Sequence, residues 1–215
     1  MTTKLELYNK AGGHLRQERL LDLTDDVVLK RELDAVYDAT LQICLEEGLW
    51  KWSLRSIEIS ADPSIDTSDF GGFAYGFTLP TDFVRIANIN ADPYFRANSE
   101  VTDFEITGPG KTLYCDTESF FLKYVSNGAT FGLDLASWPE SFAEAVGARL
   151  AEKIAMRVTK SSDDHKACLA FGDRWMQQAK IRDAVDERIK AKPTGRLVRA
   201  RAGGGRPKPN GPLWG

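Results

Sequence analysis

Residues 137–158, SWPESFAEAVGARLAEKIAMRV, carry the clearest structural signal in the chain. Ser137 and Glu140 have the spacing of a capping box, and the proline between them is tolerated in the first turn of a helix. Large apolar residues recur four apart along one ridge, and a row of small residues runs beside it: Ala143, Gly147, Ala151 and Ala155. Small side chains let a neighbouring helix approach closely. We therefore expect a helix at the centre of a bundle.

The N-terminal 52 residues also predict helix. A short helix is expected over residues 4–10, ended by the glycines at 12–13. A longer one is expected from the N-cap candidate Thr24, with acidic residues in its first turn, to Gly48. Its apolar residues recur every three or four positions, which is the period of a half-buried helix.

A last helix is expected after the central one. It should begin at the cap formed by residues 161–162, with Cys168, Trp175, Met176 and Ala179 on its apolar face. It should end before Pro193.

Between the helical parts, the sequence predicts β-structure. Trp50 and Trp52 stand two apart, which favours entry into a strand. Extended segments are expected at residues 54–61, 76–80, 83–89 and 120–125, and a β-hairpin at 104–115. Residues 65–76 are rich in glycine and aromatics and are typical of a loop.

Together these elements predict an α+β protein. A discontinuous helical bundle, built from the N-terminal helices and two C-terminal helices, should carry a central β-rich insertion and end in an extended C-terminal tail. The body would span residues 1–192, with helices in 1–52 and 137–192 and the insertion in 53–136, followed by a basic Gly/Pro-rich arm at 193–215. The composition agrees, since 42% apolar and 27% charged residues in a 215-residue chain are ordinary for one globular domain with an appendage.

The cysteines and the hydropathy of the chain indicate the kind of compartment in which the protein resides. Cys44, Cys115 and Cys168 lack the Cys-x-x-Cys spacing of zinc or redox motifs, so we expect three free thiols in or near the core and a reducing compartment. No apolar run approaches the ~18 residues of a membrane span, and the first ten residues lack a signal-peptide pattern.

Motifs for catalysis are weak. Residues 108–112, Gly-Pro-Gly-Lys-Thr, end like a phosphate-binding loop, but Glu105 stands where that motif needs glycine and a strand pattern follows, so a hairpin turn is the better interpretation. Residues 163–165, Asp-Asp-His, suit a helix start better than a metal site, and His14 is isolated among polar residues. We expect no enzyme, no catalytic or metal-binding residue and no cofactor.

Six aromatic residues gather around the first part of the insertion. They are Trp50, Trp52, Phe70, Phe73, Tyr75 and Phe77. One interpretation is that they seal the junction between helices and sheet. The other is that Phe70, Phe73, Tyr75 and Phe77 form a surface partly buried by a partner chain, because aromatics are enriched at interface cores.

The C-terminal arm differs in charge from the rest of the chain. Residues 190–215 hold seven lysines and arginines and no acidic residue; subtracting these seven from 28 leaves 21 basic against 31 acidic residues elsewhere. Fully extended, 23 residues reach ~70 Å at about 3.3 Å per residue, enough to touch something beyond the body. The arm could bind phosphates, order against a partner protein or stay solvated. Its Leu213-Trp214 end favours a hydrophobic pocket on a protein.

The order of these segments resembles the head-to-tail adaptor family of short-tailed bacteriophages, also called tail tubular protein A. The resemblance covers about residues 1–192. It is carried by LWKW at 49–52, FTLPTDFVRI at 77–86, KTLYCD at 111–116, FLKYV at 121–125 and WPESFAEAV at 138–146. Its most telling pieces are the tryptophan-rich helix end at 49–52, the Leu-Pro-x-Asp-x-x-Arg stretch at 79–85 and the Pro-Glu-x-Phe helix opening at 139–142. The arm matches no motif of the family.

The resemblance implies a non-enzymatic virion protein, assembled in the host cytoplasm and placed at the neck between head and tail. Copies of the chain would form a twelve-subunit ring that binds the portal protein above and the tail nozzle protein below, while genomic DNA passes through the lumen. We expect the arm to order in a groove of the portal through Arg196, Arg199, Arg201, Arg206, Lys208, Leu213 and Trp214, and the four aromatics from Phe70 to Phe77 to face a neighbouring subunit or the nozzle.

Two other functions remain open from the sequence. A nucleic-acid-binding protein would use the basic residues in 196–208. A head-completion connector of a long-tailed phage would share the helical bundle but usually has a smaller β insertion than residues 53–135.

Overall fold

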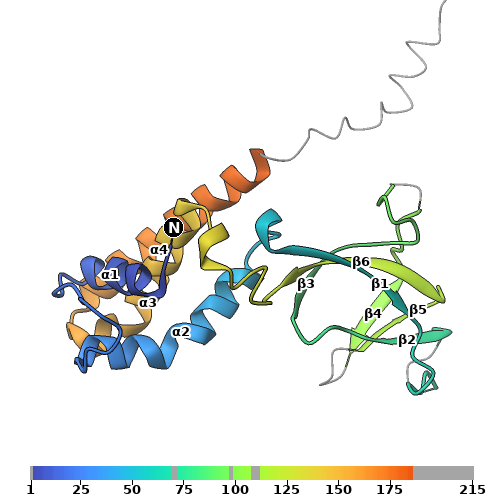
Figure 1. Cartoon of the computed structure of the whole chain (residues 1–215), viewed down its shortest axis with the longest axis horizontal. Helices are drawn as coiled ribbons and strands as arrows, with labels where there is room; N and C mark the ends of the chain where they lie inside the picture. The colour runs from blue at the N-terminus through green and yellow to red at the C-terminus, as the bar shows by residue number, and fades with distance from the viewer. Residues whose placement is uncertain (1, 69–71, 97–98, 108–111, 186–215) are drawn as a thin grey trace, which may run out of the picture. The chain divides into compact units, whose positions relative to one another are not determined.

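The computed structural model describes residues 2–68, 72–96, 99–107 and 112–185 (Figure 1). The chain divides into two units, Met1–Ala184 and Val185–Gly215. The arm predicted at 193–215, and the end of the predicted body at 186–192, lie outside the described residues.

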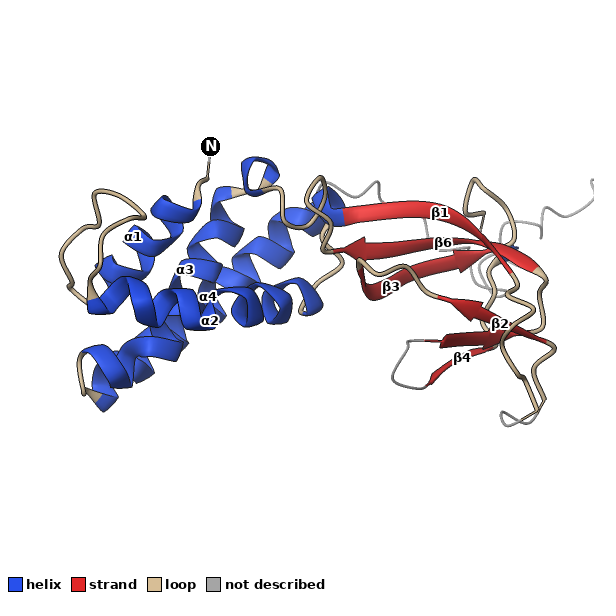
Figure 2. Ribbon diagram, turned by 60° about the horizontal axis from the view of Figure 1, so that its bottom comes forward, coloured by secondary structure: helices blue, strands red, loops and turns tan. Residues whose placement is uncertain are grey.

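The predicted α+β class is confirmed. Helices α1 (Lys4–His14) and α2 (Val28–Glu46) precede the β-strands, and α3 (Glu140–Val158) and α4 (Ser162–Val185) follow them. Figure 2 shows the helices gathered into one region and the strands into another. The bundle is therefore discontinuous in sequence, as its pattern predicts.

Helix α3 is the centre of the bundle, and both α1 and α2 pack against it. The predicted row of small residues on α3 is buried, with Ala143, Ala151 and Ala155 fully enclosed. At the fourth member, Gly147, a Cβ atom would lie 2.9 Å from Cβ of Lys10 on α1. The neighbour that the small row predicts is therefore α1.

Two predicted boundaries of the N-terminal helices are wrong. Helix α1 continues through both glycines to His14, because Gly12 is buried where a Cβ would come within 3.2 Å of Leu29 Cδ2. Helix α2 begins at Val28, with Val27 and not Thr24 as the residue before it. Thr24 instead donates its backbone N–H to Asp22 Oδ1 within a turn of the preceding loop.

The predicted capping box at Ser137 and Glu140 is also wrong. Ser137 ends a 3-10 turn (Leu135–Ser137), and its hydroxyl donates to the carbonyl oxygen of Asp134. Helix α3 begins after Pro139 without a side-chain cap. The cap predicted for α4 is present, since Asp164 N–H donates to Ser161 Oγ at 3.2 Å.

The insertion contains two three-stranded antiparallel sheets. One has the order β1 (Leu54–Ser60), β6 (Ser119–Ser126), β3 (Phe83–Asn90), and the other has the order β2 (Tyr75–Thr78), β5 (Thr112–Cys115), β4 (Phe104–Thr107). The predicted hairpin is confirmed, because β4 and β5 pair from Thr107 opposite Thr112. A helix would have to follow Thr112 in a phosphate-binding loop, and a strand begins there instead.

Trp50 and Trp52 do not enter a strand as predicted. Trp50 precedes a 3-10 turn (Lys51–Ser53) that contains Trp52, and β1 begins only at Leu54. Trp50 is buried, with its indole N–H donating to the carbonyl oxygen of Cys44 at 3.1 Å, and its own carbonyl accepts from Ser53. These bonds stabilise a compact turn, so the spacing of two does not reflect strand alternation here.

Two hydrophobic cores hold the described residues together. One lies among the helices and includes Cys44 and Cys168; the other lies between the sheets and includes Phe77, Phe120 and Cys115. All three cysteines are free and buried, as their spacing predicts.

Candidate functional site

The joint between helices and sheets is built from aromatic side chains. Residues 47–53 and 127–139 are the two connections between the regions. Phe142 on α3 stands at the centre of the cluster, with ring centroids 4.8 Å from Trp50, 4.9 Å from Trp52 and 4.9 Å from Trp138. Trp50 and Trp52 therefore lie at the junction, as the first interpretation of the aromatics expects.

Asp82 is the polar centre of the same joint. Its carboxylate accepts hydrogen bonds from Tyr124 Oη (2.9 Å), Ser126 Oγ (2.5 Å) and Arg55 Nη1 (3.0 Å). Burial by itself would raise the pKa of Asp82, but these hydrogen bonds outweigh it and hold the pKa below its ordinary value. Asp82 is thus a charged acceptor that fixes the ends of β1 and β6 beside the turn before β3.

Arg85 ties this sheet to the bundle. Its Nη1 donates to the carbonyl oxygen of Glu46, the last residue of α2, at 3.1 Å. The last turn of α2 has no basic residue of its own, so the guanidinium supplies the positive charge that favours a helix C-terminus. Asp82 and Arg85 are the two charged positions of the Leu-Pro-x-Asp-x-x-Arg stretch, and both act at the joint.

The predicted aromatic surface is only partly available. Phe77 is fully buried, with its ring centroid 4.6 Å from that of Phe120, so it belongs to the sheet core and not to a surface. Phe73 and Tyr75 are half-buried, and Phe70 lies outside the described residues. The seven arm residues, Arg196, Arg199, Arg201, Arg206, Lys208, Leu213 and Trp214, also lie outside them.

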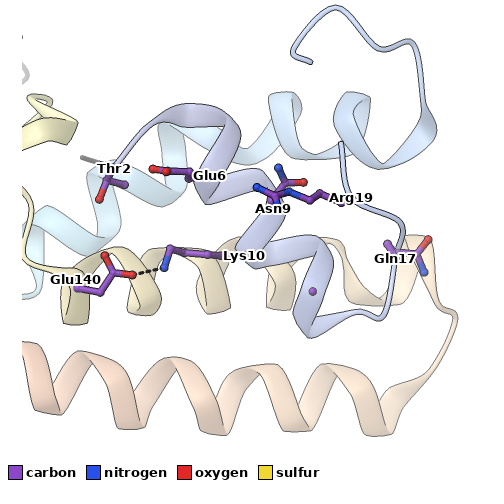
Figure 3. Close-up of a pocket in the computed structure, with 8 residues that line it drawn as sticks. Thr2, Glu6, Asn9, Lys10, Gln17, Arg19 and Glu140 are labelled. Atoms are coloured by element: carbon purple, nitrogen blue, oxygen red, sulfur yellow. Dashed lines mark hydrogen bonds and ion pairs between the residues drawn. The ribbon is translucent and has the colours of Figure 1, made fainter. Parts of the chain in front are cut away.

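A cavity of about 500 Å³ opens beside α1 (Figure 3). Most polar groups lining it already have partners. Lys10 pairs with Glu140 and Glu144, and Glu6 completes a capping box with Thr3. Asn9 exchanges two hydrogen bonds with the backbone of Leu20. These contacts hold α1, α3 and the following loop together and offer no reactive group.

His14 is not solvated as its sequence context predicts. It is half-buried at the end of α1 and stacks on Phe171 of α4, with ring centroids 5.6 Å apart. Burial lowers the pKa of His14. Asp163 and Asp164 occupy the first turn of α4, where carboxylates complement the helix dipole. Across the described ranges, no three His, Cys, Asp or Glu side chains gather in a way that could hold a metal ion.

Sequence patterns missed a set of exposed apolar side chains. Leu21 in the loop between α1 and α2 is 85% exposed, and Ile181 on α4 is 63% exposed. Helix α4 buries only a narrow stripe, which contains Cys168, Gly172, Met176 and Ala179. The sequence signal that could have identified this loop is Leu21, an apolar residue close to aspartates between two predicted helices.

Comparison with known proteins gives no assignment: no family model matches the sequence, and no curated protein matches it significantly. None of the described helices is long and apolar enough to cross a membrane.

Proposed function

We propose that the protein is a structural head-to-tail adaptor of a short-tailed bacteriophage. Twelve copies would form a ring at the neck of the virion, joining the portal protein to the tail nozzle protein and lining the channel through which genomic DNA leaves. The ring would be assembled in the host cytoplasm. In this function the chain binds its neighbours and makes or breaks no covalent bond.

The observation that carries this proposal is the construction of the joint. A bundle built from segments before and after the strands carries a β insertion, and residues from several stretches of the resemblance meet where the two are connected. Asp82 and Arg85 bind β6 and α2, while Trp138 and Phe142 fill the space beside Trp50. The motifs therefore support the same architecture that the resemblance implies.

The exposed apolar side chains favour an oligomer over a monomer. Leu21 and Ile181 lie on different elements, and each exposes more than half of its side chain to water. A ring needs two different surfaces on every subunit, each used once. Because each contact repeats around the ring, modest affinity per contact is sufficient.

The arm supports a role at the portal. Seven basic residues and a terminal Leu-Trp pair suit a groove that offers acidic groups and an apolar pocket. Removing the chain from Thr194 onward should abolish attachment to portal rings. Normal attachment of that truncated protein would contradict this part of the proposal.

The decisive experiment measures mass. Native mass spectrometry and electron microscopy of the full chain, alone and mixed with the portal protein of the same phage, should reveal twelve copies in a closed ring on the portal. A mixture in which the two proteins stay separate at micromolar concentration would refute the adaptor function.

A second candidate function, nucleic-acid binding through the arm, is favoured by the charge of residues 196–208. It predicts that the isolated protein binds DNA or RNA with an affinity that falls steeply as salt rises. Replacing Arg196, Arg199, Arg201 and Arg206 by glutamine should then remove binding. The adaptor function predicts instead that the same variant loses portal attachment.

A further inference from the structure

The first half of the loop between α1 and α2 is anchored to the helical core. Leu15 and Leu20 are buried in the helical core. The side chain of Asn9 on α1 donates to the carbonyl oxygen of Leu20 at 3.1 Å and accepts from its N–H at 2.8 Å, as a neighbouring strand would. The backbone of the loop is thus fixed immediately before Leu21.

The next residues form a turn held by aspartates. Asp25 Oδ2 accepts from the N–H groups of Leu21 and Asp22, each at 3.1 Å, and Asp22 Oδ1 accepts from Thr24 N–H at 2.8 Å. This turn presents Leu21 to water, 85% exposed. An apolar side chain on a backbone that is already ordered loses little further conformational entropy when a partner covers it.

A second exposed surface runs along α4. Phe171, Arg174, Gln178 and Ile181 follow one another at three- and four-residue spacing, so they share one face of the helix. Phe171 is 44% exposed and Ile181 63% exposed. Neither Arg174 nor the nearby Arg182 forms an ion pair with any residue in the described ranges.

The two surfaces are complementary in charge. Residues 20–26 hold three aspartates and no basic residue, and one of the three, Asp26, pairs with Arg31 of α2 at 3.5 Å. The face of α4 around Ile181 holds Arg174 and Arg182 beside its apolar residues and no acidic residue. Each surface therefore combines exposed apolar area with charge, and the charges of the two surfaces have opposite signs. Opposite charges of this kind guide two partners into the correct relative orientation as they associate.

We propose that the turn around Leu21 of one copy docks on the Phe171–Ile181 face of α4 of a second copy. The two surfaces consist of different residues, so each copy can offer its turn to one neighbour and its α4 face to another, as a heterologous contact requires. Contacts of this kind close into a ring when the rotation between copies permits it. This inference rests on the proposed adaptor function, because it names the contact by which the ring would be built.

Mixed-variant cross-linking tests the contact directly. L21C and I181C are made in separate full-length proteins, mixed, and treated with a short bifunctional maleimide. A covalent dimer should form in the mixture and in neither variant alone, because a heterologous contact brings Leu21 near Ile181 of another copy only. L133C, at an exposed leucine of the joint (41% exposed), mixed with I181C is the matched control and should give no dimer.

Charge and apolar substitutions test the same contact by assembly. L21E or I181E should raise the concentration at the midpoint of self-assembly roughly ten- to a hundredfold, as expected for the loss of one buried leucine or isoleucine at each contact. R174D/R182D should weaken assembly, and adding D26R, which leaves the turn-forming Asp22 and Asp25 in place, should restore part of it. Unchanged thermal unfolding of each variant shows that the monomer still folds, since all of these side chains are at the surface.

The outcomes separate this inference from the adaptor function. Rings that form normally with L21E, or rings of mixed L21C and I181C chains that never cross-link, overturn the docking contact while leaving the adaptor function in place. Cross-linked chains that never attach to portal overturn the adaptor function and support the contact. A chain that stays monomeric both alone and with portal overturns both.

Discussion

Gly147 on α3 lies directly against Lys10 on α1, so closely that a Cβ on the glycine would be 2.9 Å from Cβ of the lysine. The side chain of Lys10 packs here directly on the backbone of α3. Lys10 then reaches along α3 to pair with both Glu140 and Glu144. The close contact between α1 and α3, and with it the two salt bridges of Lys10, therefore depends on the absence of a side chain at Gly147.

The substitution G147A should destabilise the protein. The added methyl group overpacks the contact with Lys10, which we expect to cost about 1–3 kcal/mol in the free energy of unfolding. The control is G13A in α1, where a Cβ would meet nothing within 4 Å. G13A should be neutral or stabilise by about 0.5–1 kcal/mol through helix propensity. Urea unfolding measures both, and equal stability of the two variants would contradict the close packing.

Replacing Asp82 by asparagine should loosen the joint. Its amide nitrogen cannot accept the hydrogen bonds that the carboxylate now receives from Ser126, Tyr124 and Arg55, so at least one donor is left unsatisfied. We expect a loss of about 1–3 kcal/mol in unfolding free energy. D103N, at an exposed aspartate of the same insertion, should leave stability unchanged. If D82N unfolds at the wild-type urea concentration, the polar centre of the joint does not stabilise the fold.

Asp34 should make the contact between α1 and α2 sensitive to acid. Its carboxylate accepts from Tyr8 Oη at 2.6 Å and pairs with Lys4 and Lys30. The hydrogen bond from Tyr8 is the largest cause that lowers the pKa of Asp34 from 3.8 to about 2 in the folded protein. Because the folded pKa lies below the unfolded one, this stabilisation is complete above about pH 4 and is lost as the pH falls toward 2.

The measurement compares the wild type with D34N in urea between pH 7 and pH 2. The stability difference should be constant down to about pH 4 and shrink below it. D103N provides the baseline for acid effects unrelated to Asp34. A difference that persists undiminished at pH 2 would show that the charge of Asp34 is not what stabilises the contact.

The three thiols should be unreactive in the folded protein. Burial raises the pKa of Cys44 to about 12, and it raises the pKa of Cys115 and Cys168 as well. At pH 8 the reactive thiolate is therefore scarce and enclosed. A disulfide-exchange reagent should titrate no thiol within minutes under native conditions and three in concentrated urea. Rapid native modification of one thiol would place that cysteine at the surface.

Part of the joint and of the interaction surface could be predicted from sequence. One interpretation of the aromatics places Trp50 and Trp52 at the junction, where they pack against Phe142. The other interpretation places Phe77 at a surface, but Phe77 is buried, because exposure depends on which sheet covers a strand and not on the aromatic residue itself. The turn around Leu21 was missed, since the hydrogen bonds that shape it come from Asp25 and from Asn9 on another element.

The α+β class, the central helix and most strand positions follow from the sequence alone, because apolar periodicity depends only on neighbours along the chain. The pairing of α1 with the small row of α3, the turn at Trp50 and the start of α2 at Val28 were decided by tertiary structure. Local sequence signals for those features competed with burial and with hydrogen bonds between residues as distant in sequence as Lys10 and Glu144. Only the folded chain brings such partners together, and their contacts outweigh the propensities of a single segment.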